Sequence, residues 1–299
     1  MGTKIFIDGQ AGTTGLGIAG RLRDAGGFSL IELADHDRKD PKARQRAMGE
    51  AEVTILCLPD DAAREAVALA PAGARILDAS TAHRVAPGWV YGFAEMAPGQ
   101  AALIAGAARV ANPGCYATGA IALLRPLREA GILAAEAALS INAVSGYSGG
   151  GKAMIAEHER AGGPAFELYA LGLKHKHLPE IMAYSGLARA PVFVPSVGHF
   201  AQGMLVSVPL HLDALGVTPA RLAALYEAFY GENGVVVPRG LWGENLTPEA
   251  LNGSNRLEIF VAANEAGTQA VLIARLDNLG KGASGAAVQN LNLMLGRSE

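Results

Sequence analysis

Short apolar strands alternate with helical segments through the first third of this chain, and this alternation is the feature that most constrains its fold. Residues 4–8, 30–34, 53–58 and 74–78 have the apolar composition of buried strands, and a helical pattern covers residues 62–70. Parallel strands must be joined by long crossover segments, usually helices, whereas antiparallel strands can be joined by tight turns. The alternation therefore predicts an α/β fold with a doubly wound parallel sheet, which binds ligands at the carboxyl ends of its strands.

A glycine-rich loop joins the first of these strands to the helical pattern that follows it. Its spacing, G-x-x-G-x-x-G, departs from the dinucleotide fingerprint G-x-G-x-x-G, but it still lets a pyrophosphate approach the backbone and a helix N-terminus. No Gly-Lys-Ser/Thr sequence ends the loop, so it is not a P-loop. A tight strand-to-helix turn would also use glycines, but the position of the loop favours a Rossmann-type dinucleotide site. The expected contacts are Gly9, Gly12, Thr13, Thr14 and Gly15.

The residues after the second expected strand bear on the choice between NAD and NADP. Asp35 lies 20 residues beyond Gly15, where a carboxylate binds the ribose hydroxyls of NAD. Arg38, Lys39 and Arg44 follow it and could instead bind the 2′-phosphate of NADP, or they could belong to a solvated surface loop. These residues by themselves leave the choice of dinucleotide open.

The pattern changes after residue 115, where longer strands are expected over residues 138–144, 192–194 and 203–210. They predict a mixed sheet in a second, α+β domain. Residues 282–295 begin with small residues and then carry an apolar stripe, so they predict a C-terminal helix that packs back on the first domain. We expect a dinucleotide-binding domain at 1–114 plus about 280–299. The catalytic and oligomerisation domain is expected at 115–279.

Composition excludes several classes of protein. Half of the 299 residues are hydrophobic and the formal net charge is −3, so the chain is globular and has no basic field for nucleic acid or an anionic membrane. It contains only two cysteines, which argues against a disulfide framework. No secretory leader and no apolar run of 18 residues are evident. We expect a cytoplasmic protein without nucleic-acid or membrane partners.

Cys115 follows the turn sequence Asn-Pro-Gly and precedes an apolar stripe at Ile121, Leu124 and Leu127 that fits one helix face. The thiol would then lie in the first turn of a helix. Unpaired N–H groups and the helix dipole favour a thiolate there. A free cysteine can also be a small buried hydrophobe, but the Pro-Gly pair before this thiol favours an exposed nucleophile.

Two histidines and a glutamate supply a candidate base for such a nucleophile. His175 and His177, at positions i and i+2, are expected on one face of an extended segment, and Glu180 could orient the imidazole of His177 in a Cys-His-acid arrangement. The three residues could also bind zinc. No nearby cysteine or third histidine accompanies them, so no metal is expected. His199, which comes just before a strand, is a rival base.

Further polar residues lie in the loops that follow strands. Arg84, after the strand that ends at Asp78, could bind a phosphate or carboxylate, or form an ion pair with Asp78 or Glu95. The loop after residue 144 carries hydroxyls and amides suited to an anionic substrate. The expected additional cofactor contacts are Ser80, Asn278 and Gly280. The expected substrate contacts are Arg84, Asn112, Ser145, Gly146, Ser148, His175 and His199.

Taken together, several motifs resemble those of the N-acetyl-γ-glutamyl-phosphate reductases of arginine biosynthesis, a branch of the semialdehyde dehydrogenase superfamily. They are Gly-Gln-Ala-Gly-Thr-Thr-Gly, Asp-Ala-Ser-Thr-Ala-His-Arg, Asn-Pro-Gly-Cys-Tyr-Ala-Thr, Ser-Gly-Tyr-Ser-Gly-Gly-Gly-Lys, His-Lys-His-Leu-Pro-Glu-Ile and Asp-Asn-Leu-Gly-Lys-Gly-Ala-Ser-Gly. The chain is most similar to the shorter, second type of the family. Longer members have a different, acidic motif where this chain has residues 80–84. Related aspartate-semialdehyde dehydrogenases usually have Asn-Cys-Ser/Thr around the nucleophile instead of Gly-Cys-Tyr.

This resemblance implies that Cys115 is the nucleophile, that the loop at residues 9–15 binds NADP and that His177 is the acid–base. It implies NADPH-dependent reduction of N-acetyl-glutamyl 5-phosphate, an acyl phosphate, to N-acetyl-glutamate 5-semialdehyde through a cysteine thioester. We also expect a homo-oligomer, either a dimer or a tetramer. The alternatives are a reductase like aspartate-semialdehyde dehydrogenase, and a non-enzymatic NADP-binding redox sensor in which Cys115 is oxidised.

Overall fold

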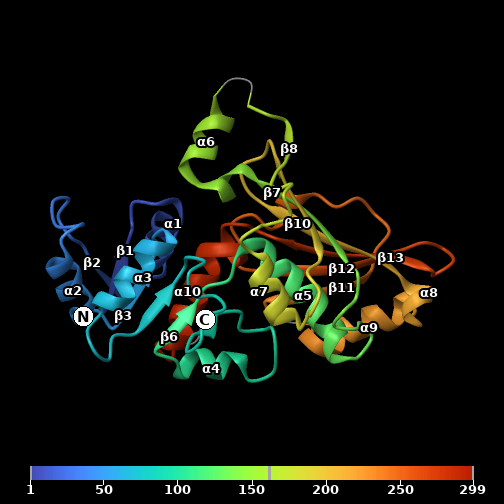
Figure 1. The fold of residues 1–299 in the computed structure, drawn as a ribbon, viewed down its shortest axis with the longest axis horizontal. Helices are drawn as coiled ribbons and strands as arrows, with labels where there is room; N and C mark the ends of the chain where they lie inside the picture. The colour runs from blue at the N-terminus through green and yellow to red at the C-terminus, as the bar shows by residue number, and fades with distance from the viewer. Residues whose placement is uncertain (1, 161–162, 233, 298–299) are drawn as a thin grey trace. The chain divides into compact units, whose positions relative to one another are not determined.

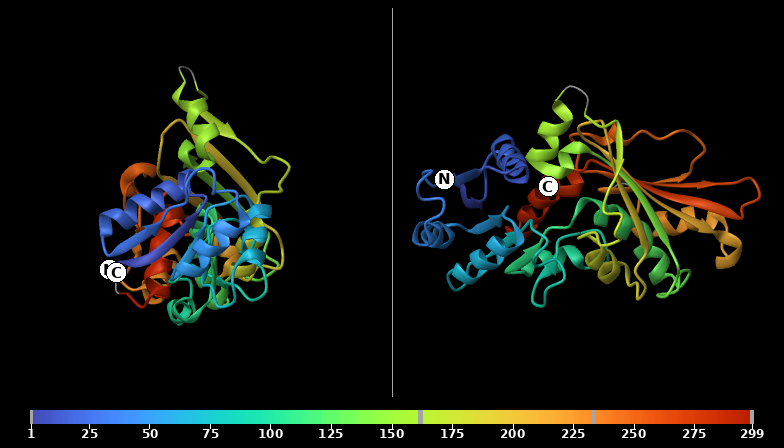
Figure 2. Two further views of the ribbon diagram at one scale, coloured as in Figure 1. Left: turned by 90° about the vertical axis from the view of Figure 1, so that its left-hand side faces the viewer. Right: turned by 45° about the horizontal axis from the view of Figure 1, so that its top comes forward.

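Two β-sheets, one parallel and one mixed, organise the chain (Figures 1 and 2). The computed structural model describes residues 2–160, 163–232 and 234–297. The chain divides into two units, Met1–Pro113 with Ala283–Glu299, and Gly114–Gly282. The predicted fold class, a doubly wound parallel sheet combined with an α+β part that has a mixed sheet, is confirmed.

The first unit contains a six-stranded sheet in the order β2-β1-β3-β4-β6-β5, with every neighbouring pair parallel. The order reverses direction at β1, as expected for a doubly wound sheet. Its strands are β1 (Thr3–Asp8), β2 (Phe28–Ile31), β3 (Val53–Leu56), β4 (Ile76–Asp78), β5 (Val90–Tyr91) and β6 (Arg109–Ala111).

Helices cover both faces of this sheet because side chains alternate along its strands. Ile5 and Ile7 pack into one buried cluster with Ile18 and Leu291, whereas Phe6 packs into another with Met48. The C-terminal helix contacts α1, α4 and β4 of this unit, where the apolar stripe predicted that it would pack. The helices are α1 (Thr13–Ala25), α2 (Pro41–Glu50), α3 (Asp60–Leu69), α4 (Gln100–Gly106) and α10 (Gly285–Met294).

The strand expected over residues 30–34 lies earlier in the chain, at Phe28–Ile31. Gly26 and Gly27, both with positive φ, end α1 and turn the chain into β2 at once. Pairing of Phe28 with Thr3 then sets the start of the strand. Leu33, which the apolar pattern placed in the strand, packs beyond its end against the Phe6 cluster.

The second unit contains a seven-stranded mixed sheet in the order β11-β12-β13-β10-β7-β9-β8. The pairs β7–β9 and β11–β12 are parallel and the other pairs are antiparallel. Its strands are β7 (Ser140–Gly146), β8 (Phe166–Leu168), β9 (Val192–Gly198), β10 (Met204–His211), β11 (Val236–Leu241), β12 (Leu257–Ala263) and β13 (Gln269–Leu276).

Helices α5 (Cys115–Glu129) and α9 (Pro219–Tyr230) pack on the mixed sheet, and α7 (Leu178–Ser185) packs on α5. Helix α5 contacts β10 and β13, where Val206 and Ala274 lie against Gly119. Helix α9 contacts β11 and β12. The unit also contains α6 (Gly151–Glu159), α8 (Leu212–Leu215) and the 3-10 helices η1 (Tyr147–Gly150) and η2 (Pro248–Leu251). A π-helical turn, η3 (Gly280–Ser284), begins in this unit and leads into α10 of the first.

Within the described part of the chain, none of the helices combines the length and the apolar character needed to cross a membrane.

Candidate active site and dinucleotide pocket

The glycine loop of the first unit packs so closely against backbone that side chains would not fit at two of its glycines. Gly9 has φ of +87°, and a Cβ there would lie 2.3 Å from the carbonyl oxygen of Cys57. A Cβ at Gly15 would lie 2.7 Å from the carbonyl oxygen of Gly9. The N–H of Gly12 donates to that same carbonyl, and α1 begins directly afterwards at Thr13. Tight glycine packing thus places the helix N-terminus at the carboxyl end of β1.

A cavity of about 450 Å³ lies against this loop. Gly9, Gln10 and Ala11 line one part of it, and Arg38 and Lys39 line another. Arg38 also forms an exposed ion pair with Asp35 at 2.9 Å. A backbone that includes a glycine and two positively charged side chains are both groups that can bind phosphate, so this cavity fits a dinucleotide that carries phosphate groups.

Arg44, the third cation suggested for a 2′-phosphate, does not line this cavity. Its guanidinium donates twice to one carboxylate oxygen of Asp8, from Nε at 3.0 Å and from Nη2 at 2.7 Å. Burial raises the pKa of Asp8 even though Arg44 acts in the opposite direction. Arg44 therefore pairs with Asp8 at the buried end of β1 and lies outside the lining of this cavity.

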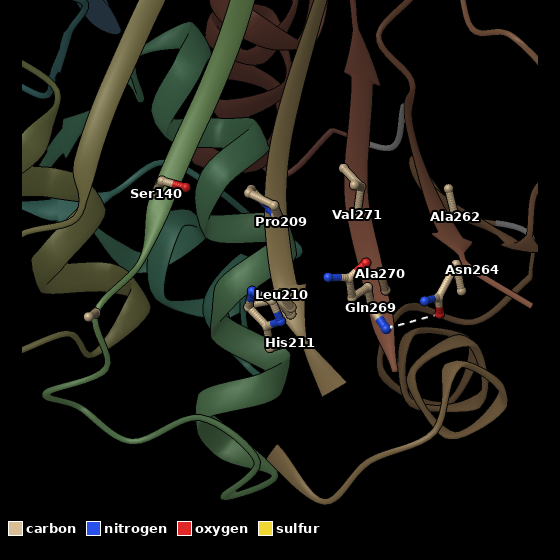
Figure 3. Close-up of a pocket in the computed structure, with 11 residues that line it drawn as sticks. Ser140, Pro209, Leu210, His211, Ala262, Asn264, Gln269, Ala270 and Val271 are labelled. Atoms are coloured by element: carbon tan, nitrogen blue, oxygen red, sulfur yellow. Dashed lines mark hydrogen bonds between the residues drawn. The ribbon is translucent and has the colours of Figure 1, made fainter. Parts of the chain in front are cut away.

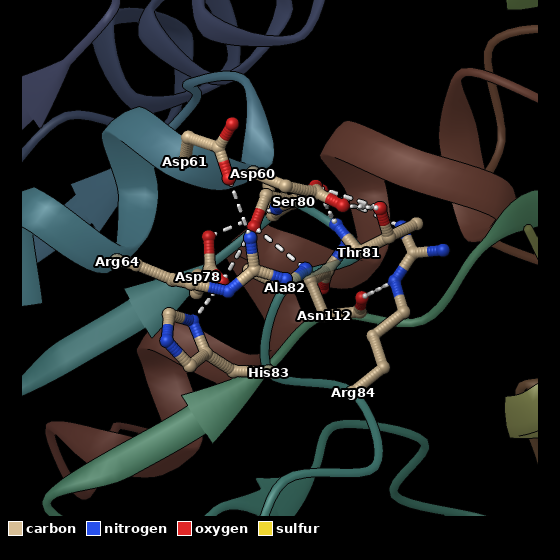
Figure 4. A network of polar contacts seen from close by, with 11 residues as sticks. Asp60, Asp61, Arg64, Asp78, Ser80, Thr81, Ala82, His83, Arg84 and Asn112 are labelled. Atoms are coloured by element: carbon tan, nitrogen blue, oxygen red, sulfur yellow. Dashed lines mark hydrogen bonds and ion pairs between the residues drawn. The ribbon is translucent and has the colours of Figure 1, made fainter.

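A polar network follows β4 at the carboxyl edge of the parallel sheet (Figure 4). Asp78 accepts hydrogen bonds from the backbone N–H and the hydroxyl of Ser80 and lies 2.6 Å from Nδ1 of His83. The carboxylate of Asp60 accepts from both the N–H and the hydroxyl of Thr81. The hydroxyl of Ser80, a predicted cofactor contact, is thus directed at Asp78. His83, which the sequence analysis did not single out, is the histidine of this network.

Arg84 and Asn112 are buried and have partners within the first unit. Nε of Arg84 donates to the carbonyl of Asn112 at 3.0 Å (Figure 4). The side-chain amide of Asn112 donates to the carbonyl of Ala283 and accepts from Asn290 on α10. These two predicted substrate contacts connect the carboxyl edge of the sheet to the C-terminal helix.

Cys115 is the first residue of α5, as predicted, and it is partly exposed. Gly114 is the N-cap residue and has an extended backbone without a side chain that could cap the helix. A Cβ added at Gly282 would lie 2.8 Å from Cβ of Cys115, so a glycine is needed beside the thiol. No local sequence pattern marks this contact, because the two residues are far apart in the chain.

The segment that carries His175 and His177 is a turn, and the expected extended conformation is wrong. His177 has φ −87° and ψ −10° and is the N-cap residue of α7, which begins with Leu178 and Pro179. Proline in the first turn of a helix is favoured because its fixed φ fits the helix and its missing N–H is not needed there. The two imidazoles still lie together, with ring centroids 4.6 Å apart.

Glu180 connects this turn to the N-terminus of α5. Its Oε2 accepts a hydrogen bond from the N–H of Gly114 at 3.1 Å, and its Oε1 lies 4.0 Å from Nε2 of His177. The second distance is at the outer limit of an ion pair and longer than a hydrogen bond. Glu180 and His177 are both buried. The turn, α7 and the helix that starts with Cys115 thus form one arrangement within the second unit.

The other predicted residues of the second unit form a separate set of contacts. Nδ2 of Asn278 donates to the hydroxyl of Ser148 at 2.9 Å, and its Oδ1 accepts from the N–H of Gly203. The hydroxyl of Ser145 donates to the carbonyl of Gly146. At Gly280, a Cβ would lie 2.0 Å from the carbonyl oxygen of Ser254. In the second unit, these expected cofactor and substrate residues therefore contact other residues of the same unit.

His199 is exposed and pairs with a histidine that the sequence analysis did not single out. Its Nδ1 lies 3.1 Å from Nδ1 of His158, a buried residue of α6 that stacks on Tyr147. Among the residues with a described structure, no group of three or more His, Cys, Asp or Glu side chains is arranged to hold a metal ion.

Comparisons with known proteins agree with this architecture. Residues 115–278 match the family model "Semialdehyde dehydrogenase, dimerisation domain". The chain is 52% identical to N-acetyl-gamma-glutamyl-phosphate reductase 2 of Pseudomonas putida, with 98% of this chain and 96% of that protein covered. It is 50% identical to N-acetyl-gamma-glutamyl-phosphate reductase of Brucella canis, with 99% and 100% covered.

Solved structures of lower sequence identity share the fold. Aspartate semialdehyde dehydrogenase II from Vibrio cholerae has a TM-score of 0.72 at 15% identity, with 99% of both chains covered. Aspartate semialdehyde dehydrogenase with NADP from Candida albicans has a TM-score of 0.66 at 11% identity, again with 99% of both chains covered.

Proposed function

This chain belongs to the N-acetyl-gamma-glutamyl-phosphate reductase family of oxidoreductases, and we propose that it reduces N-acetyl-glutamyl 5-phosphate to N-acetyl-glutamate 5-semialdehyde and phosphate. NADPH is the proposed reductant, and a thioester on Cys115 is the proposed intermediate. The observation that carries the proposal is the link from Glu180 to Gly114. It ties the helix that bears His177 to the residue directly before the thiol.

Cys115 is the proposed nucleophile because it starts a helix whose N-cap is a glycine. The thiolate attacks the acyl carbon of the substrate, a carbon–sulfur bond forms, and the carbon–oxygen bond to phosphate breaks. His177 takes the thiol proton at the start of the reaction. The N–H groups of Cys115 and Tyr116, in the first turn of α5, are the proposed donors to the oxyanion, a role in which loss of one donor typically costs about 3 kcal/mol of barrier.

The proposed cofactor site is the cavity beside the glycine loop. The backbone of the glycine loop, of which Gly9, Gln10 and Ala11 line the cavity, would hold the pyrophosphate. Arg38 and Lys39 would bind the 2′-phosphate that distinguishes NADP from NAD. The bound reduced dinucleotide supplies the hydride that converts the acyl group to the oxidation level of an aldehyde. Sulfur then leaves the hemithioacetal carbon, and His177 returns a proton to Cys115.

Covalent capture by Cys115 has a chemical purpose. An acyl phosphate in water is open to hydrolysis, whereas a thioester retains the carbonyl group on the protein until it is reduced.

Six of the predicted substrate contacts remain candidates, namely Arg84, Asn112, Ser145, Gly146, Ser148 and His199. In the structure they have partners in the protein, so binding of the substrate would exchange some of these hydrogen bonds.

The open face of the mixed sheet supports a proposed homo-oligomer. The face opposite α5 carries the apolar residues Leu205, Val271 and Ile273, with exposed Phe166 and Leu168 at its edge. These residues line a hollow of about 620 Å³. A second hollow of about 610 Å³ adjoins it and shares Val271 (Figure 3). We propose that a second copy of the chain covers this face, in accordance with the matched dimerisation model.

The decisive experiment runs the reaction in reverse, from semialdehyde, phosphate and NADP, and measures NADPH formation. We expect turnover with N-acetyl-glutamate 5-semialdehyde that requires phosphate, and none with Cys115→Ser, which should still bind the dinucleotide. Faster turnover of aspartate semialdehyde would assign the substrate to the class of the structural relatives. If turnover were absent in the unmodified chain while the dinucleotide bound, the redox-sensor alternative would replace the proposal.

A further inference from the structure

A chain of hydrogen bonds connects Tyr169, which no sequence motif marked, to the backbone of His177. The hydroxyl oxygen of Tyr169 lies 3.3 Å from Nε2 of His175. On the other side of the same ring, Nδ1 of His175 accepts a hydrogen bond from the N–H of His177 at 3.1 Å. We propose that Tyr169 is a positioning residue that acts through His175 on His177. This inference rests on the proposed role of His177 as the acid–base.

The two hydrogen bonds assign a tautomer to His175. Because Nδ1 accepts from a backbone N–H, the proton of the neutral ring is on Nε2. Nε2 then donates to the oxygen of Tyr169. The opposite tautomer would direct the N–H at Nδ1 toward the N–H of His177, and the turn would lose its hydrogen bond. The N–H of His177 thus sets the tautomer of His175, and the oxygen of Tyr169 accepts the remaining ring N–H and holds the ring in place.

Aromatic neighbours fix the plane of the His175 ring but not the position of its proton. Phe193 contacts the ring edge-on at a centroid distance of 5.0 Å, and Tyr116 does so at 5.8 Å. Tyr116 is itself anchored through its hydroxyl to the carbonyl of Ser196 at 2.8 Å. Neither aromatic contact distinguishes the two ring nitrogens. The N–H of His177 makes that distinction, and the oxygen of Tyr169 holds the ring at its other nitrogen.

The backbone between Tyr169 and His175 is held in an unusual conformation. Ala170 and Leu173 have φ of +51° and +56°, in the left-handed region that residues other than glycine rarely adopt. Such a segment persists where surrounding contacts hold it, and it is often found at functional sites. The N–H of Tyr169 donates to the carbonyl of Pro195, and the carbonyl of His175 accepts from the N–H of Leu178. Both ends of the segment are thus fixed, and they present the hydroxyl to the ring.

The first test is kinetic and uses Tyr169→Phe, which removes the hydroxyl and keeps the ring. Tyr230→Phe is the matched control, because it removes a phenol hydroxyl that donates to the carbonyl of Ala122 on α5, in the same unit. We expect kcat of Tyr169→Phe to fall about tenfold, the effect of losing one net hydrogen bond, with KM for both substrates changed less than twofold. The control should keep its kcat. An unchanged kcat in Tyr169→Phe would overturn the proposal.

The second test measures the environment of the Nε2–H of His175, which a tyrosine without this contact would not alter. In protein labelled with ¹⁵N-histidine, two-bond nitrogen–hydrogen correlation spectra identify the Nε2–H tautomer, and His175→Gln assigns the His175 signals. We expect this tautomer in the unmodified chain, in Tyr230→Phe and in Tyr169→Phe, because the N–H of His177 sets it. The Nε2–H proton should exchange with solvent faster in Tyr169→Phe alone, because it loses its acceptor there. An unchanged exchange rate in Tyr169→Phe would refute the inference.

The two proposals can fail separately. The spectra need no turnover, so they remain informative if the reverse reaction is absent or if Cys115→Ser keeps its activity. Those results would refute the proposed function alone. If Tyr169→Phe lowered kcat while solvent exchange of the His175 Nε2–H stayed unchanged, the positioning proposal would fail and the proposed function would stand.

Discussion

The carboxylate of Glu180 accepts a hydrogen bond from the backbone N–H of Gly114 at 3.1 Å. Gly114 directly precedes Cys115, and Glu180 lies in the first turn of the helix that follows His177. One buried side chain therefore connects the start of the nucleophile helix to the turn that carries the proposed base. The contact joins residues 66 positions apart in the chain.

Replacing Glu180 should separate the role of its hydrogen bond from the role of its charge. In Glu180→Ala the N–H of Gly114 loses a buried acceptor, so the free energy of unfolding should fall by about 1–3 kcal/mol. Glu180→Gln keeps an acceptor oxygen and should lose less than half as much. Urea unfolding of both variants measures the difference. Equal losses would show that the charge, not the hydrogen bond, stabilises the junction.

The choice of dinucleotide can be tested at Arg38. If its guanidinium binds the 2′-phosphate, Arg38→Ala should raise Kd for NADPH by about ten- to a hundredfold, since hydrogen bonds to charged groups contribute about 1.5–3 kcal/mol. Kd for NADH should change less than twofold. Fluorescence titration measures both constants. Arg221→Ala, which removes an exposed arginine of α9 in the second unit, is the control. An equal loss for the two dinucleotides would contradict the assignment.

The parts of the fold that the sequence predicted are those with a local signal. The strands at residues 4–8 and 53–58 and the stripe after Cys115 are recognised from apolar spacing, and the structure has β1, β3 and α5 there. The edge strand β2 has a weaker local signal, and its bounds depend on pairing with β1. Local patterns predict the presence of an element better than its ends.

The candidate site was predictable in its residue types but not in its contacts. The motif with two histidines and a glutamate gave the residues, whereas the alternating spacing wrongly suggested an extended segment. The proline in the motif was the available signal for a helix start. The partners of Arg44, Glu180 and His199 depend on residues more than 30 positions away, so no local pattern could supply them.

The glycine beside the thiol gives a steric prediction. A Cβ at Gly282 would lie 2.8 Å from Cβ of Cys115, a distance that requires one of the two to move. Gly282→Ala should therefore lower kcat by about a hundredfold, because small displacements of reacting groups cost that much. Gly20→Ala in α1, where a Cβ would meet nothing within 4 Å, is the control, and it should raise stability by about 0.5–1 kcal/mol. Full activity in Gly282→Ala would show that the thiol tolerates displacement.

The proposed interface between copies can be tested at Ile273, which lines the hollow on the open face of the mixed sheet. Ile273→Asp places a charge where an apolar partner surface is proposed, and burial of an unpaired charge is costly. We expect the unmodified chain to sediment as a dimer or tetramer and the variant to sediment as a smaller species. Ala224→Glu, at an exposed position of α9 on the other side of the sheet, controls for the added charge. A variant with unchanged mass would exclude this face.

Acid should destabilise the second unit through Glu258, which is buried between Arg239 and Arg275 on neighbouring strands. Burial alone would raise the pKa of this carboxyl, but the two guanidiniums, with Nε atoms at 2.8 Å and 2.9 Å, outweigh it and lower the pKa below its ordinary value of 4.5. A carboxyl with a lowered pKa binds protons more weakly in the folded state than in the unfolded state. Its contribution to stability is therefore present above pH 4.5 and is lost as the pH falls through the folded pKa. As the pH is lowered through this range, the free energy of unfolding should decrease less for Glu258→Gln than for the unmodified chain. Urea unfolding at a series of pH values measures both. Identical pH profiles would show that other carboxyls cause the acid sensitivity.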